Sequence, residues 1–293
     1  MLRTLAVASL VALAAPGITA RVDVGGTTVG VAAGGGSVWV TGDGTGKLIR
    51  IDAATNTVVK RIAVGRRPLF VALGAGSAWV TASSSGTVVR VSTATGRVQK
   101  TIHAGIQPRD VAFALGAVWV TDPIQGSVIR ISPKTNRVVK TIRGVGVEPN
   151  GIAFARGRIW VGDYTGGNLY RIDPKTNKVV GKTALPGADW ITVGPDALWV
   201  SQEQVNAVAR IDPATGAVVA RVQVGANPLG SAFVGDDLWV PNIDDNTISI
   251  VDTKTNTART VPGPPGVIAI ASRGGEAWVT SSTGNEVWRM SPG

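Results

Sequence analysis

The 293-residue sequence contains no cysteine and a single histidine, His103. Without cysteine, the chain cannot form a disulfide, a thiolate metal site or a cysteine nucleophile. With one histidine, it cannot build a metal centre or proton relay that needs two imidazoles. Charged residues are also scarce, at 16% against about 25% in typical domains, whereas apolar residues make up 44%. High hydrophobicity with so little charge excludes a disordered chain.

Long apolar runs are missing as well. No segment approaches the roughly 18 uninterrupted apolar residues that cross a bilayer as a helix. A shorter run, Leu5–Ala15, follows Arg3 and leads through small residues to Arg21, which is the layout of a secretory signal. We therefore expect residues 1–20 to be a signal peptide, cleaved after Ala20. Residues 21–293 would then form a secreted or periplasmic domain that is not integral to the membrane.

The sequence repeats itself with a period of about 40 residues. Tryptophan returns at intervals of 39 to 41 residues, each time between small or apolar neighbours as in SVWVT or ALWVS. The repeated positions are Trp39, Trp79, Trp119, Trp160, Trp199, Trp239 and Trp278. A glycine or asparagine follows each of them by seven residues, and an arginine follows six of them by eleven. Six units then continue with a D/S-x-x-T-N/G segment such as Asp173–Asn177, which predicts a tight turn capped by the Asp or Ser side chain.

Each unit divides into four short runs rich in Val and Ile, separated by Gly, Pro or Asn, and no segment after residue 20 has helical periodicity. Four strands in about 40 residues describe one blade of a β-propeller. We therefore predict an all-β fold, a seven-bladed β-propeller of four-stranded antiparallel blades. The last unit stops after its third strand, and ARVDVG from Ala20 matches the end of a fourth strand, ARVQVG from Ala220. The N-terminal strand should therefore complete blade 7 and close the ring.

The segments DPKTNKVVGKT from Asp173 and PNGIAFARGRIWVGD from Pro149 resemble the YVTN-type repeats of bacterial seven-bladed propellers, which are related to NHL repeats. The same repeat is similar to that of the streptogramin B lyases, the virginiamycin B lyase superfamily. The resemblance covers residues 21–293. It implies a propeller, but it specifies function weakly because propellers serve many unrelated functions.

The lyase resemblance would imply an active site with two histidines, a glutamate and a magnesium ion on one face. Because His103 is the only imidazole, a mechanism of that design cannot operate here. The segment Thr41–Lys47 lacks the first glycine and the Ser/Thr of a phosphate loop, and Asp244–Asn246 lacks the spacing of a calcium loop. We therefore expect no cofactor, no metal and no catalytic residue.

The net charge of +10 raises the question of an anionic partner. The cations are spread over third strands, outer strands and their turns, and no basic groove with interleaved aromatics is visible. We therefore expect no nucleic-acid partner and a monomeric protein, while weak association with an anionic cell envelope stays open.

Departures from the repeat indicate where a ligand would bind. In a propeller, the loops before the inner strand and after the second strand lie on one face, and in blades 3 to 6 they carry most of the chain's unusual polar and aromatic residues. The candidate ligand-binding residues are Arg109, Asp110, Asp122, Asn150, Asp163, Tyr164, Asp189, Trp190, Glu203 and Asn242. Trp190 would supply a stacking or cation–π surface at the mouth of the axis.

These observations favour a secreted, non-catalytic binding or scaffold protein that recognises an unidentified polar or cationic ligand or protein partner on one face. The alternative is a lyase-like propeller enzyme that uses carboxylates and a divalent metal in place of histidines. The two hypotheses differ in their demand for metal, because the enzyme should bind a divalent ion tightly and the scaffold should not.

Overall fold

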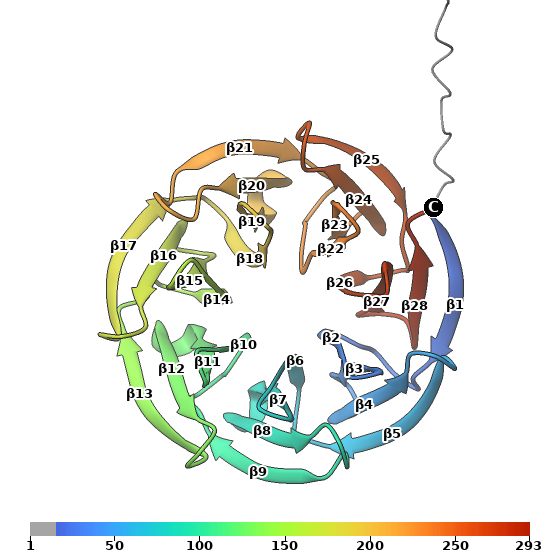
Figure 1. Cartoon of the computed structure of the whole chain (residues 1–293), viewed down its shortest axis with the longest axis horizontal. Coiled ribbons are helices and arrows are strands. Elements are labelled where there is room, and N and C mark those ends of the chain that lie inside the picture. Colours follow the sequence, from blue (N-terminus) through green and yellow to red (C-terminus); the bar gives the residue numbers. More distant parts are fainter. Residues whose placement is uncertain (1–15) are drawn as a thin grey trace, which may run out of the picture.

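The computed structural model describes residues 16–293, which form a ring of seven four-stranded antiparallel sheets around a central axis (Figure 1). The predicted seven-bladed β-propeller is therefore confirmed. Among these residues, no helix is long and apolar enough to cross a membrane. The predicted signal peptide falls mostly on residues 1–15, which lie outside the described residues.

Each of the first six blades is a continuous stretch of chain whose strands run in order from the axis outward. Blade 1 comprises β2 (Val31–Gly34), β3 (Ser37–Gly42), β4 (Lys47–Asp52) and β5 (Thr57–Ala63). Blade 2 comprises β6 (Pro68–Gly74), β7 (Ser77–Ala82), β8 (Thr87–Ser92) and β9 (Val98–His103). Blade 3 comprises β10 (Val111–Ala114), β11 (Ala117–Asp122), β12 (Ser127–Ser132) and β13 (Arg137–Arg143).

The second half of the ring repeats this order. Blade 4 comprises β14 (Pro149–Ala155), β15 (Arg158–Asp163), β16 (Asn168–Asp173) and β17 (Lys178–Ala184). Blade 5 comprises β18 (Ala188–Val193), β19 (Leu198–Gln202), β20 (Ala207–Ile211) and β21 (Val218–Gln223). Blade 6 comprises β22 (Ala232–Val234), β23 (Asp237–Asn242), β24 (Thr247–Asp252) and β25 (Thr257–Pro262). Single 3₁₀ turns follow the second strands of blades 2, 3 and 5, as η1 (Ser83–Ser85), η2 (Pro123–Gln125) and η3 (Glu203–Val205).

Blade 7 joins the two ends of the described chain. Its inner three strands are β26 (Val267–Arg273), β27 (Glu276–Ser281) and β28 (Glu286–Ser291), and its outer strand is β1 (Gly17–Asp23). The predicted closure by the N-terminal strand is therefore confirmed, and the ring has no open edge between its first and last blades. The strand begins at Gly17, however, four residues before the predicted start of the domain at Arg21.

The seven repeated tryptophans form the packing between blades. Each lies on the second strand of its blade and is at most 1% exposed. In blade 2, for example, Trp79 packs within an apolar cluster that includes Val118, Val120 and Ile129 of blade 3. The interpretation of these tryptophans as structural residues is therefore confirmed.

The repeated arginine, eleven residues after the tryptophan, links five of the seven blades to the next blade. In six blades its guanidinium carbon stacks 4.8 to 5.7 Å from the centre of the tryptophan ring of its own blade. In most of these blades the same guanidinium also donates to the D/S-x-x-T-N/G turn of the next blade. Arg130, for instance, donates to the carbonyl of Pro174 and to Oδ1 of Asn177, both at 3.0 Å. We call this arrangement the arginine latch.

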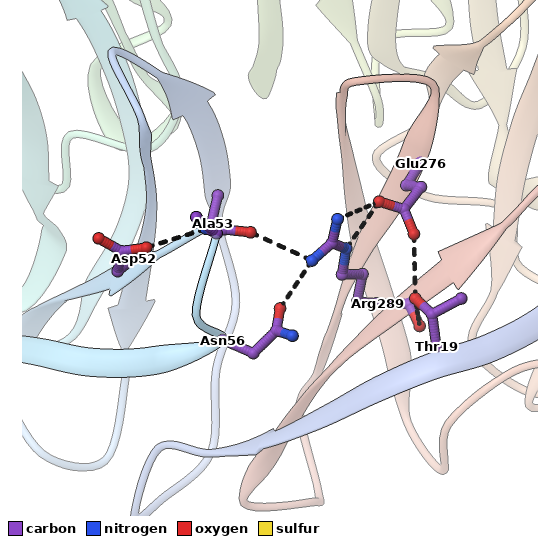
Figure 2. Close-up of polar contacts among 7 residues, drawn as sticks. Thr19, Asp52, Ala53, Asn56, Glu276 and Arg289 are labelled. Carbon is purple, nitrogen blue, oxygen red and sulfur yellow. Dashed lines mark hydrogen bonds and ion pairs between the residues drawn. The ribbon is translucent and has the colours of Figure 1, made fainter.

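The latch also closes the ring between blades 7 and 1 (Figure 2). Arg289 donates from Nη1 to the Ala53 carbonyl at 3.1 Å and to Asn56 Oδ1 at 3.0 Å, and it pairs with Glu276 through Nε and Nη2. Thr19 on β1 in turn donates to Glu276 Oε1 at 3.1 Å. The junction between the two ends of the chain therefore uses the same contacts as the other junctions.

The one departure from this arginine has a structural explanation. Blade 6 has Ile250 at the position of the repeated arginine. The next blade, blade 7, has no turn between its third and outer strands, because β28 and β1 come from opposite ends of the described chain. An arginine there would have no turn to reach. The outer strands differ in the same way. In every blade that has the arginine, the outer strand forms a β-bulge opposite it, and in blade 6 the pairing is regular.

A second link between blades runs around the axis. The residue two positions after the tryptophan is a threonine or serine in five blades, and its hydroxyl donates to a carbonyl at the start of the next blade's inner strand at 2.7 to 2.8 Å. Blades 4 and 6 carry Gly162 and Pro241 there instead. The inner ends of most blades are thus fixed to their neighbours by a buried hydrogen bond.

Replacing Trp119 with alanine should lower the free energy of unfolding by about 3–5 kcal/mol, because the side chain is fully buried and its removal leaves a cavity between blades. Chemical denaturation of the variant and the parent protein measures this difference. An unchanged midpoint would show that the repeated tryptophans do not carry the packing.

Replacing Arg130 with glutamine should cost about 1–3 kcal/mol, since the variant loses both the stacking on Trp119 and the charge-assisted bonds to blade 4. Arg143→Gln, which makes the same charge change on the exposed outer strand, is the matched control and should leave the midpoint nearly unchanged. Equal destabilisation by both variants would contradict the latch.

Candidate functional site

The axis of the propeller is filled at one level by apolar side chains from several blades. Phe70 of blade 2 and Trp190 of blade 5 meet there, with ring centroids 4.4 Å apart and planes inclined by 59°. Val29, Val111 and Leu229 belong to the same buried cluster. The prediction that Trp190 lies open at the mouth of the axis is therefore wrong: the side chain is only 7% exposed and packs as part of this axial plug.

Two glycines of blade 4 allow the neighbouring strand β18 to approach closely. A β-carbon on Gly162 would lie 2.3 Å from the Asp189 carbonyl oxygen, and one on Gly151 would lie 2.2 Å from the same atom. Any larger residue at either position would push β18 away. The sequence therefore brings the backbone of Asp189 and Trp190 against blade 4 by omitting side chains there.

Asp189, Arg109 and Trp190 form the centre of the candidate site. Asp189 is fully buried, and its Oδ2 lies 3.9 Å from Nη2 of Arg109, an ion pair at the limit of contact. The Arg109 guanidinium carbon lies 6.0 Å from the centre of the Trp190 ring, so it reaches the indole as well. The Arg109 side chain is about one-third exposed, which places it between the buried carboxylate and solvent.

Glu203, the first residue of η3, adds a second carboxyl group beside Asp189. Burial and the adjacent Asp189 carboxylate raise the pKa of Glu203 to about 10, whereas Arg109 opposes the increase. Glu203 therefore stays protonated at neutral pH, because ionising it beside a second carboxyl group in a dry site is costly. Burial also raises the pKa of the nearby Tyr164, and the charge of Glu203 adds to that effect.

Asp110 lies next to this centre but is used by the backbone. It accepts hydrogen bonds from the amides of Val111 at 2.7 Å and Ile152 at 2.9 Å, and so connects blade 3 to blade 4. Burial raises its pKa to about 7 despite these two bonds. Asp110 therefore adds a carboxyl group to the sector, and its two oxygens connect β10 of blade 3 to β14 of blade 4.

The site contains an unusual number of buried polar atoms without a hydrogen-bond partner. In the described part of the chain they include Nε of Arg109, Nε1 of Trp190, Oε1 of Glu203, Oδ1 of Asn150 and both carboxylate oxygens of Asp189. Such atoms are rare in folded proteins and costly unless water or a ligand satisfies them. Their concentration on blades 3, 4 and 5 makes this sector the candidate ligand site.

Three of the predicted site residues belong to a different arrangement. Asp122, Asp163 and Asn242 each follow their tryptophan by three residues and are fully buried under the loop that enters their own blade. Asp122 accepts from the amide of Ile106 at 2.7 Å, and Asp163 accepts from the amide of Glu148 at 2.8 Å. These side chains support loops around the site, and the structure does not bring their polar atoms to the Asp189 centre.

Sequence reasoning passed over two residues that the structure places in this sector. Phe70 occupies the same repeat position as Asp110 and Trp190, nine residues before the tryptophan, and its size was a usable signal. Glu148 lies in the loop before β14, where its carboxylate accepts a hydrogen bond from Thr165 and adds negative charge near Glu203 and Tyr164. The only sign of that loop in the sequence is the spacing from Trp119 to Trp160, which is 41 residues and thus one or two longer than the other intervals.

The rest of the described molecule offers weaker alternatives. No group of three His, Cys, Asp or Glu side chains within residues 16–293 has an arrangement that could hold a metal ion. His103 lies apart from the Asp189 centre, exposed at the end of β9, where it lines a peripheral cleft of about 630 Å³ with Ser85 and Gln125. This position agrees with the interpretation of His103 as a surface residue.

Comparison with solved structures places this architecture among known propellers. No protein-family model and no curated protein sequence matches the chain. A virginiamycin B lyase from Staphylococcus aureus superposes with a TM-score of 0.83 at 17% identity, covering 93% of this chain and 98% of the lyase. A streptogramin B lyase structure gives 0.80 at 18% identity, with 92% and 93% covered. The chain has the propeller fold of the streptogramin B lyases.

The fold is not confined to those lyases. The hydrazine synthase of Kuenenia stuttgartiensis superposes on the chain with a TM-score of 0.81 at 16% identity, covering 93% of this chain and 97% of that one. Two enzymes with different names thus match this lyase-like propeller equally well. At these identities the similarity establishes the fold alone, and function has to be argued from the residues of the site.

Glu203→Gln should make the protein less sensitive to rising pH. The pKa of Glu203 is raised from 4.5 to about 10 in the folded state, so its contribution to stability is complete below about pH 4.5 and is lost as the pH rises toward 10. We expect the variant to match the parent near pH 4.5 and to exceed it at pH 8 in denaturant titrations. Asp244→Asn, the same charge change on an exposed turn, is the control. A variant less stable than the parent at pH 8 would contradict the buried carboxyl pair.

Proposed function

We propose that the protein is a secreted, non-catalytic binding protein that recognises an organic cation, an ammonium or guanidinium group, at the sector formed by blades 3, 4 and 5. One observation carries the proposal: in residues 16–293, neither carboxylate oxygen of the fully buried Asp189 accepts a hydrogen bond from an N–H or hydroxyl group, and its polar neighbours are the Glu203 carboxyl group and, at 3.9 Å, Arg109. A buried carboxylate with so few donors is unfavourable in the free protein, and a ligand that brings N–H donors and positive charge relieves that cost.

The surroundings of Asp189 favour an organic cation over a neutral ligand. Glu203 offers a second carboxyl group, Asn150 offers an unpaired amide oxygen, and Trp190 presents an indole whose ring already attracts the Arg109 guanidinium. The Arg109 guanidinium lies on the side of Asp189 where a ligand cation would bind, but at 3.9 Å it is too far away to donate a hydrogen bond. We therefore propose that the ligand cation takes the place of Arg109 beside Asp189 and pairs directly with the carboxyl groups of Asp189 and Glu203.

The charge distribution supports the same ligand class. The protein has a formal net charge of +10, yet the sector around Asp189 contains four acidic residues, Asp110, Glu148, Asp189 and the protonated Glu203, and the single guanidinium of Arg109. A local acidic field within a basic surface draws cations to one position and repels them elsewhere. Weak association of the basic outer rim with an anionic cell envelope is compatible with this arrangement.

Binding is tested by thermal shift and calorimetry of the mature protein with agmatine, spermidine and arginine methyl ester as cationic probes, and with glycerol and acetate as neutral and anionic controls. We expect at least one cation to raise the melting temperature, since a ligand specific for the native state stabilises it. Asp189→Asn should abolish that shift, and Arg109→Met should increase it by removing the internal competitor. Asp244→Asn should leave it unchanged. Absence of a shift with every cation, or loss of binding in Arg109→Met, would contradict the proposal.

The same screen distinguishes the alternative function, a lyase-like propeller enzyme that uses carboxylates and a divalent metal. Glu203 favours this alternative, because a carboxyl group whose pKa is raised by burial beside a second carboxyl group can serve as a general acid in hydrolysis. Tight, saturable stabilisation by Mg²⁺ or Mn²⁺ that is lost in Glu203→Gln would support the enzyme over the binding protein.

A further inference from the structure

The outer strand of blade 7 lies across the predicted signal-peptide boundary. Strand β1 begins at Gly17, whereas cleavage after Ala20 would leave a chain starting at Arg21. Three of the six residue pairs that join β1 to β28 involve Gly17, Ile18 and Ala20. Cleavage after Ala20 would therefore remove half of the pairing that closes the ring.

The lost segment is a regular part of the blade. Thr19 forms a β-bulge in β1 opposite Arg289 and Met290 of β28. The outer strands of blades 1 to 5 have a bulge at the equivalent position. The outer strands of the other blades contain six or seven residues, as β1 does. A chain beginning at Arg21 would keep only Arg21, Val22 and Asp23 of its strand.

The segment also takes part in the arginine latch at the closure. Thr19 donates to Glu276 Oε1 at 3.1 Å, and Glu276 is the acidic partner of Arg289, which reaches across to Ala53 and Asn56 of blade 1 (Figure 2). Blade 2 contains the equivalent contact, in which the bulged Gln99 accepts from Ser77 Oγ at 3.0 Å and Ser77 accepts from Arg90. Without residues 17–20, the edge of β28 around the buried Met290 would lose its neighbour.

The sequence offers an alternative cleavage position upstream of the strand. Ala12, Leu13 and Ala14 form the A-x-A pattern that signal peptidases recognise, whereas cleavage after Ala20 would place the large Ile18 three residues before the cut. The residues from Leu5 to Val11 still supply an apolar segment of the length expected of a signal.

We propose that the export signal is removed between Ala14 and Ala15, so that the mature protein keeps all of β1 and closes blade 7 with a full-length outer strand. This inference rests on the proposed export of the protein. It is independent of the ligand proposed for the Asp189 site.

The test is the N-terminal mass of the full chain after export from a bacterial host. We expect a mature protein that begins at Ala15. Ala14→Gln should block processing because it places a large residue next to the cut, whereas Ala20→Gln, the matched control, should leave the cleavage position unchanged. A mature chain that begins at Arg21 would overturn the proposed position, and a chain that retains Met1 in every fraction would overturn export itself.

A stability measurement gives a second, independent outcome. Purified chains starting at Ala15 and at Arg21 should differ in melting temperature by at least about 5 °C, with the shorter chain less stable, because it lacks half of the closing strand. Equal melting temperatures would show that residues 17–20 do not contribute to closure and would remove the structural reason for upstream cleavage.

Discussion

The arginine latch is the interaction on which the rest of the ring depends. Each tryptophan fills the space between two sheets, and in five blades an arginine stacked on it also bonds to the turn of the next blade. Stacking of this kind contributes about 0.5–2 kcal/mol, and a charge-assisted hydrogen bond contributes about 1.5–3 kcal/mol. Because one side chain makes both contacts, a blade cannot tilt away from its neighbour without losing both. The turn asparagines, with left-handed backbone as at Asn136 and Asn177, present their side-chain oxygens to this arginine.

The same contacts explain how a chain with two free ends forms a closed ring. At the junction between blades 7 and 1, Arg289 makes the usual bonds to the next turn while β1 supplies the missing outer strand. Five of the six repeated arginines bond to the next turn; Arg50 of blade 1 instead donates to Ser37 of its own blade, and blade 6 has Ile250 where the next blade offers no turn. Closure is therefore built from the repeated contacts, and the N-terminal strand is as much a part of the repeat as any internal strand. The whole ring therefore depends on an intact β1.

The candidate site arises where the ring departs from its own repeat. Glycines at 151 and 162 bring Asp189 and Trp190 close to blade 4, and the replacement of threonine by Gly162 removes the hydroxyl link found in five other blades. Compared with those blades, the sector lacks one hydrogen bond between blades and contains a buried carboxylate that accepts no N–H or hydroxyl hydrogen bond within residues 16–293. Such a local loss of stability is common where a protein binds a ligand, because the ligand supplies the missing partners.

The sequence by itself determined the blade count, the strands, the role of the seven tryptophans and the closure, because each of these depends on a pattern that occurs many times and averages out local exceptions. It also placed Arg109, Asp189 and Glu203 among the departures from that pattern. Only the tertiary structure decided which departures meet. Asp122 and Asp163 turn inward to support their loops, Asp110 is used by backbone amides, and Trp190 packs against Phe70 from across the axis. The reason is physical: the direction of a side chain and the approach of two blades depend on packing around the whole ring, and no repeat unit contains that information alone.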